Sequence, residues 1–450
     1  MYVRMRKNLN SPKRALISML ALFNPKSKGP RNSTTLSVAF RFRKDDKSMR
    51  KIFRSAIISA IVIAVISIYL PTGASAKDIK VGSVINLTGP ASTWGQFNAK
   101  GQKDYFRYVN EVKGGIEGNK IVLTVVDSAY KVPEAVKYVK KFCVQDKMDI
   151  IATWSAGSGI MAKPIIQKYK IPNINFSTYQ GILKPPVDYA FLPYGSYIMD
   201  SYAVLEYILA IHKGNEPPKV GLLTCNKPYG KSIHKPSKEF AEKHKINIVG
   251  IEEFPPKSID LNTELLRLKK NGAEYIFMQC LPSAIIMALQ ASDRIQYDVP
   301  FFGTWTSTDP GFFKRGKGLI RDRMHMQFPG GLPVDGTPGI KVMEELWKRY
   351  GTVEKFDASY WEGVAIGMIM EKAFRRAYNQ SWKIDSKTIN AALESFDDED
   401  FGGLIPNVTY TKTDHGASFK ARIVKINEDA SYTPLTNFWS PGKQKVEIIK

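Results

Sequence analysis

The run Trp154-Ser155-Ala156-Gly157-Ser158-Gly159 contains residue types that could bind a small anion. It follows a β-branched run, 150–154, that reads as a strand, and it leads into a helical pattern. Small residues let an anion approach the backbone N–H groups of a helix N-terminus, where the helix dipole favours negative charge. Ser155, Ala156 and Gly157 are therefore candidate ligands of a small anion. An ordinary strand-to-helix turn rich in small residues has the same composition.

Aromatic residues also gather around the ends of predicted strands. They are Trp94, Trp154, Tyr179, Tyr194, Tyr197, Tyr229 and Trp305. Most aromatic residues in any domain are core residues, so we expect about half of these to lie outside a ligand site. Even half would build an aromatic-walled pocket, suited to stacking on a planar ligand or to caging a cation.

Motifs for catalysis and metal binding are missing from the sequence. It contains no G-x-S-x-G elbow, H-E-x-x-H helix, phosphate-binding loop or close acid/base pair, and its five histidines are scattered. No Cys-x-x-Cys motif or His/Cys cluster indicates a metal. We therefore expect a protein that is not an enzyme and that carries no cofactor and no metal.

The elements that position these residues alternate between strand and helix. In the first half we expect strands at 79–85, 120–127, 150–154 and 171–176, with helices at 95–112, 133–145 and 162–169. The second half repeats the pattern with helices at 200–212, 232–244, 261–271 and 283–295, and strands at 219–225, 246–252, 275–281 and 299–302. This order predicts an α/β fold with two doubly wound parallel-sheet lobes.

The remaining segments are too small for a third domain. Helices are expected at 340–350 and 360–378, and the stretch 402–446 is strand-like and polar. We expect these pieces to complete the lobes through a multi-strand hinge. The first lobe would then comprise 77–196 plus about 331–390, and the second 197–330 plus about 391–450. Ligands of parallel sheets bind at the carboxyl ends of the strands, so the predicted site is the cleft between the lobes.

The segment after the first predicted strand resembles a known family. It reads Asn86-Leu87-Thr88-Gly89-Pro90-Ala91-Ser92-Thr93-Trp94-Gly95, and after a helix comes Val109-Asn110-Glu111-Val112-Lys113-Gly114-Gly115-Ile116-Glu117-Gly118-Asn119-Lys120-Ile121. This order, followed by a strand ending in Asp127, resembles the periplasmic leucine/isoleucine/valine-binding proteins of ABC importers. The resemblance implies two lobes that close around a ligand, with a membrane permease and its ATPase as partners.

The same resemblance implies ligand contacts along the mature chain. The loop at Ser155 would hold the ligand carboxylate, and Trp94 would lie at the cleft. Ser177, Thr178 and Tyr179 occupy the family's next ligand-touching turn, although they could instead cap the loop that follows. Tyr229, in a Tyr-Gly pair after a strand, would face the cleft, although it could be a packed aromatic residue.

Trp305 departs from the family pattern. Members that bind amino acids carry an acidic residue at this place, which pairs with the ligand ammonium. An unpaired buried amine is costly, so we expect a preference for a carboxylate with a flat or apolar body over leucine, isoleucine or valine. Asp309 could replace the missing acid by reaching back.

The N-terminal region reads as a secretory leader. The first 76 residues hold 15 basic and two acidic residues, so they carry 13 of the 23 net positive charges. A basic segment, 49–54, an apolar run of 15 residues, 56–70, and small residues up to Ala76 are typical of a signal peptide. We expect Met49 to be the true start, 1–48 to be a mis-annotated or non-structural extension, and cleavage after Ala76. A functional extension is the alternative.

The remaining 374 residues carry a net charge of only +10, and their charged runs read as solvated faces. We therefore expect no nucleic-acid partner. Three Cys do not form a disulfide framework, although Cys225 and Cys280 could be neighbours in one sheet, paired or as free thiols.

The sequence thus indicates a monomeric, periplasmic solute-binding protein of a branched-chain-amino-acid-type ABC importer. Its ligand would be a small carboxylate, either an amino acid or an aromatic or apolar acid. A periplasmic sensor that signals to a membrane receptor would share the fold, and a periplasmic enzyme is a second alternative.

Overall fold

The β-branched runs of the first half form a parallel sheet. The computed structural model describes residues 77–449, so the predicted extension and signal peptide lie outside the described residues. The strands are β1 (Ile79–Ile85), β2 (Ile121–Asp127), β3 (Ile150–Thr153), β4 (Asn173–Asn175) and β5 (Ala190–Phe191), in the order β2-β1-β3-β4-β5. All neighbours pair in parallel, as in the register Ile79 to Ile121.

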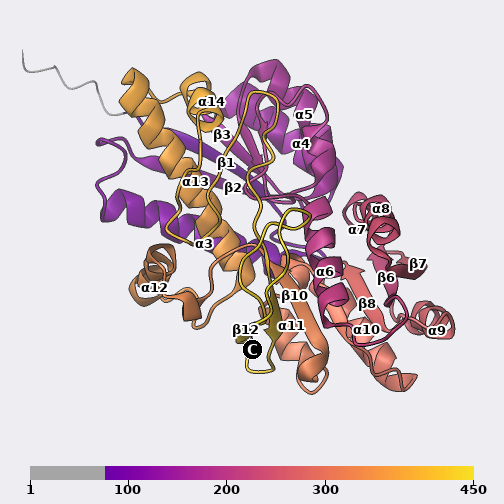
Figure 1. The fold of residues 1–450 in the computed structure, drawn as a ribbon. Coiled ribbons are helices and arrows are strands. Elements are labelled where there is room, and N and C mark those ends of the chain that lie inside the picture. The colour runs from indigo at the N-terminus through magenta and orange to yellow at the C-terminus, as the bar shows by residue number, and fades with distance from the viewer. Residues whose placement is uncertain (1–76, 450) are drawn as a thin grey trace, which may run out of the picture. The chain divides into compact units, whose positions relative to one another are not determined.

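The second sheet is mixed. Its strands are β6 (Lys219–Cys225), β7 (Asn247–Phe254), β8 (Tyr275–Gln279), β9 (Phe301–Gly303), β10 (Met324–Phe328), β11 (Arg422–Ile426) and β12 (Tyr432–Pro434). The order is β12-β11-β10-β9-β8-β6-β7. Strands β6 to β10 pair in parallel, whereas β11 and β12 are antiparallel additions at one edge. The predicted fold of two α/β lobes is confirmed (Figure 1).

Helices cover both sheets. Those of the first half are α3 (Ser92–Glu111), α4 (Val132–Lys141), α5 (Ala156–Tyr169) and α6 (Tyr197–Ile211). The second half contributes α7 (Pro228–Lys231), α8 (His234–His244), α9 (Asn262–Lys270), α10 (Pro282–Arg294), α11 (Pro310–Gly316), α12 (Pro338–Tyr350), α13 (Ala358–Ser381) and α14 (Ser386–Glu394).

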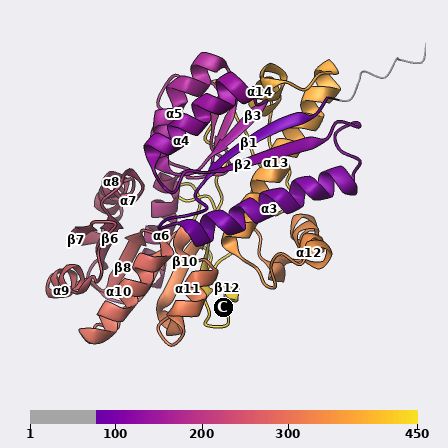
Figure 2. The same cartoon turned by 180° about the vertical axis from the view of Figure 1, so that it is seen from behind.

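Alternation along β1 explains how the first sheet is covered on both faces. Val81 and Ile85 point to the core that includes Tyr105 of α3 and Ile369 of α13, whereas Val84 points to the core formed with α4 and α5. Helices α3 and α13 consequently lie side by side on one face, and α4 and α5 cover the other (Figure 2).

Several predicted boundaries were wrong. Helix α5 begins at Ala156 rather than at 162, because Ser155 caps it and the small residues that follow are accommodated as its first turn. The strand-like stretch 402–446 contains only β11 and β12 as strands. Helices α11 and α14 and strand β10 were not predicted.

The chain crosses between the sheets more than once. It leaves the first sheet after β5, returns after β10 so that α12 and α13 pack on α3, and crosses again before β11. The Tyr410 hydroxyl donates to the Leu192 carbonyl over 2.7 Å, and Leu192 N donates to the His415 carbonyl over 3.0 Å. Because these residues lie against the first sheet, we propose that the last crossing falls near residue 417 rather than 391.

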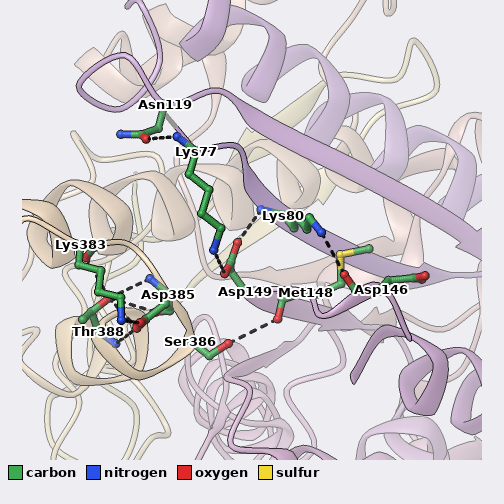
Figure 3. A network of polar contacts seen from close by, with 10 residues as sticks. All are labelled: Lys77, Lys80, Asn119, Asp146, Met148, Asp149, Lys383, Asp385, Ser386 and Thr388. Carbon is green, nitrogen blue, oxygen red and sulfur yellow. Dashed lines mark hydrogen bonds and ion pairs between the residues drawn. The ribbon is translucent and has the colours of Figure 1, made fainter. Parts of the chain in front are cut away.

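The first described residues are attached at the amino ends of the strands. Lys77 N donates to Asn119 Oδ1 over 2.9 Å, and its Nζ lies 3.8 Å from Asp149 (Figure 3). Asp149 also accepts from Lys80 N, and nearby Ser386 of α14 donates to the Met148 carbonyl over 3.4 Å. This network lies at the edge of the sheet opposite the carboxyl ends of its strands.

Candidate functional site

A small cavity lies where the carboxyl ends of strands from both sheets meet. Its lining residues are Trp94, Tyr130, Trp154, Ser155, Ala156, Phe176, Ser177, Tyr197, Tyr229, Leu281, Trp305 and Thr306. The segments after β1, β2, β3 and β4 contribute from the first lobe, and those after β6, β8 and β9 from the second. The cavity therefore has the interlobe position predicted for a ligand of two facing parallel sheets.

Six of the nine predicted ligand residues line this cavity. They are Trp94, Ser155, Ala156, Ser177, Tyr229 and Trp305. The lining residues that were not predicted as ligands are Tyr130, Trp154, Phe176, Tyr197, Leu281 and Thr306. Each lies near the end of a strand or, for Tyr197, at the start of α6, so the same positional signal could have found them.

The other three predicted residues do not line the cavity. A Cβ at Gly157 would meet Val132 Cγ2 at 2.8 Å, so this position faces α4. Thr178 is buried, and its carbonyl accepts from Tyr197 N over 3.3 Å. The ring of Tyr179 lies against Gly181.

Ser155 shapes the loop that precedes α5. Its φ is +88°, an uncommon conformation for a residue with a side chain. Its Oγ accepts from Ser158 N over 3.2 Å and its carbonyl accepts from Gly159 N over 3.0 Å. The amides of Ala156 and Gly157 precede this first intrahelical bond, and Ala156 is at the cavity, so the loop can offer an N–H group to an anion there.

Aromatic rings form most of the cavity wall. Trp94 and Trp305, from different lobes, have centroids 5.8 Å apart and planes inclined at 59°. Tyr130 and Trp154 are 5.8 Å apart at 58°. Tyr197 and Tyr229 are 5.1 Å apart at 59°. Tyr194, expected near the site, packs edge-on against Trp305 behind the lining.

Glu362 of α13 holds one wall from behind. Its fully buried carboxyl accepts from Trp94 Nε1 over 2.9 Å, from Asn98 Nδ2 over 2.8 Å and from the Tyr194 hydroxyl over 3.0 Å. Burial raises the pKa of Glu362 to about 8, although the hydrogen bonds from Trp94, Tyr194 and Asn98 oppose the shift. No sequence motif marks this residue, and it was not predicted.

A second buried carboxyl lies beside Trp305. Asp200, in the first turn of α6, has 2% exposure, and burial raises its pKa well above the usual range, opposed by the nearby Trp305 N–H. The two groups are close but outside hydrogen-bond geometry: neither Trp305 Nε1 nor Asp200 Oδ2 has a partner among the described residues.

Asp309 does not take the place of the acid missing at Trp305. Its Oδ1 accepts from Phe312 N over 2.6 Å and caps α11, and it lies outside the cavity lining. Burial raises its pKa, although the hydrogen bond from Phe312 opposes this effect. The suggestion that Asp309 reaches back into the site is therefore wrong for this conformation.

Asp127 explains the polar loop after β1. Its carboxylate accepts hydrogen bonds of 2.7 to 3.3 Å from the backbone N–H groups of Leu87, Thr88 and Ala129. It also accepts a hydrogen bond of 2.6 Å from the Thr88 hydroxyl. Because this residue fixes the backbone that leads into Trp94, its contribution to the site is indirect.

The three cysteines are buried, and they form neither a disulfide nor a metal site in the described part of the chain. Cys143, Cys225 and Cys280 are buried and free, so Cys225 and Cys280 are unpaired neighbours on β6 and after β8. Among residues 77–449 no group of His, Cys, Asp and Glu side chains is arranged to hold a metal ion. In the same range no helix combines the length and apolarity needed to cross a membrane.

Comparisons with known proteins agree with this architecture. The Leu/Ile/Val-binding protein homolog 7 of Brucella suis biovar 1 is 24% identical over 400 residues, covering 85% of this chain and 94% of the relative. A branched chain amino acid ABC transporter structure from Thermus thermophilus with bound valine has a TM-score of 0.74 at 22% identity, covering 81% of this chain and 97% of that one. The fatty acid ABC transporter substrate-binding protein from Thermomonospora curvata has a TM-score of 0.74 at 20% identity, covering 84% and 96%.

A family model described as periplasmic binding protein matches residues 78–431. The family resemblance read from the loop after β1 is thereby confirmed. The chain belongs to the periplasmic binding protein family.

Proposed function

We propose that this protein is the substrate-binding component of an ABC importer, which captures a small carboxylate between two closing lobes and delivers it to a membrane permease and its ATPase. The observation that carries the proposal is the interlobe cavity, whose walls come from the strand ends of both sheets. A ligand that contacts both walls favours the closed state over the open one.

The cavity supports a division of roles. The N-terminus of α5, with Ser155 and Ala156, and the nearby Ser177 hydroxyl would meet the carboxylate. The aromatic rings would enclose the remainder of the ligand. Of the two similar structures, one is named for branched-chain amino acids and the other for fatty acids. Both classes of compound contain a carboxylate, which agrees with this division.

Membership of the family indicates a periplasmic location and a binding role rather than catalysis. We further propose that 49–76 is the signal peptide, that the mature monomer begins at Lys77, and that it does not bind nucleic acid. Mass spectrometry of the secreted protein should find a chain that begins near Lys77. A mature chain that retains residues before Met49 would contradict this assignment.

The function is tested by a thermal-shift screen over amino acids, aromatic acids, apolar acids and amides. A true ligand at a hundred times its dissociation constant stabilises by about 2.7 kcal/mol. The radius of gyration, from small-angle scattering, should fall when the same ligand is added, because closure compacts the lobes.

A matched pair of variants tests the site. Trp305→Leu removes a ring from the cavity wall and should weaken binding, whereas Trp382→Leu removes a tryptophan that is 78% exposed and should leave affinity unchanged. Binding without compaction, or equal affinity in both variants, would contradict an interlobe site.

A further inference from the structure

The cavity lacks a charged partner for an amine. Of the described residues that line it, none is Asp, Glu, Lys, Arg or His. Its polar side-chain groups are the hydroxyls of serine, threonine and tyrosine residues and the N–H groups of the tryptophans, and none of these groups is charged. A primary ammonium has three N–H donors that must be satisfied, and leaving them unsatisfied in a buried site is costly. A cation without N–H groups avoids this cost.

The shape of the wall favours a rounded group. Seven of the twelve lining residues are aromatic. The three neighbouring ring pairs are inclined at 58° to 59°, so the wall turns around the space between them. A flat ligand stacks best between parallel rings, and these ring pairs are not parallel.

Among these rings, Trp94 and Tyr229 have their polar edges bonded to groups of the protein. The Trp94 N–H donates to Glu362, and the Tyr229 hydroxyl bonds to Thr306 Oγ1 and lies 3.4 Å from the Cys280 carbonyl oxygen. This leaves the π-systems of the rings as the principal apolar surface of the cavity. A cation over such a face is attracted by the ring quadrupole, most strongly by tryptophan and when desolvated.

Carboxyl groups stand directly behind two of the tryptophans. Glu362 contacts Trp94, and Asp200 lies beside Trp305. The three donors to Glu362 are the neutral groups of Trp94, Asn98 and Tyr194. Because burial raises the pKa of both carboxyls, the attraction of the cavity for a cation comes from the ring faces and not from charges behind them.

We propose that the cavity is an aromatic cage for a quaternary ammonium group, and that the ligand is a small zwitterion with this group at one end and a carboxylate at the other. The carboxylate end meets the α5 N-terminus, so the inference rests on the proposed function and names the ligand class for the same cavity. It also accounts for Trp305, because a quaternary ammonium needs a ring face and not a hydrogen-bonding acid.

The test compares two probes of equal shape. Trimethylammonioacetate and tert-butylacetate differ in a positive nitrogen against a neutral carbon, and calorimetric titration gives the affinity of each. We expect trimethylammonioacetate to bind at least about tenfold more tightly, the cation–π contribution expected in a desolvated site. Leucine, its des-amino analogue and benzoate are titrated in parallel.

Two variants locate the origin of the preference. Trp305→Leu should reduce the affinity ratio of the two probes, whereas Trp382→Leu should not. Circular dichroism checks that each variant is folded.

The outcomes separate the two proposals. Equal or tighter binding of tert-butylacetate overturns the cage, and so does binding of leucine, its des-amino analogue or benzoate without binding of trimethylammonioacetate; the carboxylate-binding function stands in both cases. If no carboxylate binds, either in the thermal-shift screen or in these titrations, the proposed function fails as well.

Discussion

Replacing Glu362 by Gln should change how stability depends on pH. The wild-type carboxyl is fully buried among Trp94, Asn98 and Tyr194, and burial raises its pKa to about 8 from an ordinary value of 4.5. The folded protein therefore holds a proton that the unfolded chain has released. Between pH 4.5 and about 8 the unfolding free energy of the wild type falls as pH rises, since the folded state binds more protons than the unfolded state.

The magnitude follows from the size of the shift. One pKa unit corresponds to about 1.36 kcal/mol, so a shift from 4.5 to about 8 corresponds to about 5 kcal/mol when it is fully expressed. Glutamine resembles the protonated acid and does not titrate. The variant should thus match the wild type near pH 5 and exceed its stability at pH 9 by several kcal/mol.

Urea unfolding of both proteins at pH 5, 6, 7, 8 and 9 measures this effect, at pH values spaced across the expected transition. The difference between the two proteins at each pH cancels other titrating groups, such as Asp357, whose pKa burial raises to about 6. A difference that does not vary with pH, or a wild type that is the more stable protein at pH 9, would refute a buried carboxyl that is neutral at pH 7.

Three further substitutions test the support of the site. Asp127→Ala should lower the unfolding free energy by about 2 kcal/mol at pH 7, because several donors lose a charged acceptor. The pKa of Asp127 is lowered, because its hydrogen bonds outweigh the opposing effect of burial. The difference in unfolding free energy between the wild type and this variant should therefore shrink in urea titrations as pH falls below 3.8. Gly157→Leu should cost about 1 to 3 kcal/mol by collision with Val132, measured by urea unfolding, while ligand affinity changes little. Tyr229→Phe should lower the unfolding free energy by about 1 kcal/mol through loss of the bond to Thr306, and an unchanged midpoint would contradict that bond.

The position of the site could be predicted because it depends on local patterns. Runs of β-branched residues mark the strands, and the carboxyl ends of parallel strands share one edge of a sheet. Trp94, Ser155 and Trp305 each follow a strand, so their convergence at one cavity required only the correct order of elements. The same rule covers Tyr130, which follows β2.

Side-chain direction within a loop could not be predicted in this way. Gly157 and Thr178 are immediate neighbours of lining residues, yet Gly157 faces Val132 and Thr178 is buried away from the cavity. The direction at this loop depends on the positive φ of Ser155, a conformation that a sequence pattern does not specify.

The carboxyl groups behind the wall depend on contacts between distant segments. Trp94 and Glu362 are 268 positions apart, and they meet because α3 and α13 approach closely. A Cβ at Gly363 would lie 2.1 Å from the Asn98 carbonyl oxygen, so glycine is required for this approach. The sequence shows the glycine but not its partner helix.

These contacts between distant segments change the interpretation of Trp305, an indole at a position where an acid was expected. From the sequence alone, the indole removes a negative charge from the ligand site and makes any cation unfavourable. In the folded protein Asp200 lies beside this indole, and Glu362 is bonded to the tryptophan that packs against it. Carboxyl groups are therefore retained one layer behind the rings, where burial raises their pKa and where Glu362 holds the ring of Trp94 by a hydrogen bond. A site of this kind discriminates by charge and shape, which is why isosteric probes, one charged and one neutral, test it more directly than a series of amino acids would.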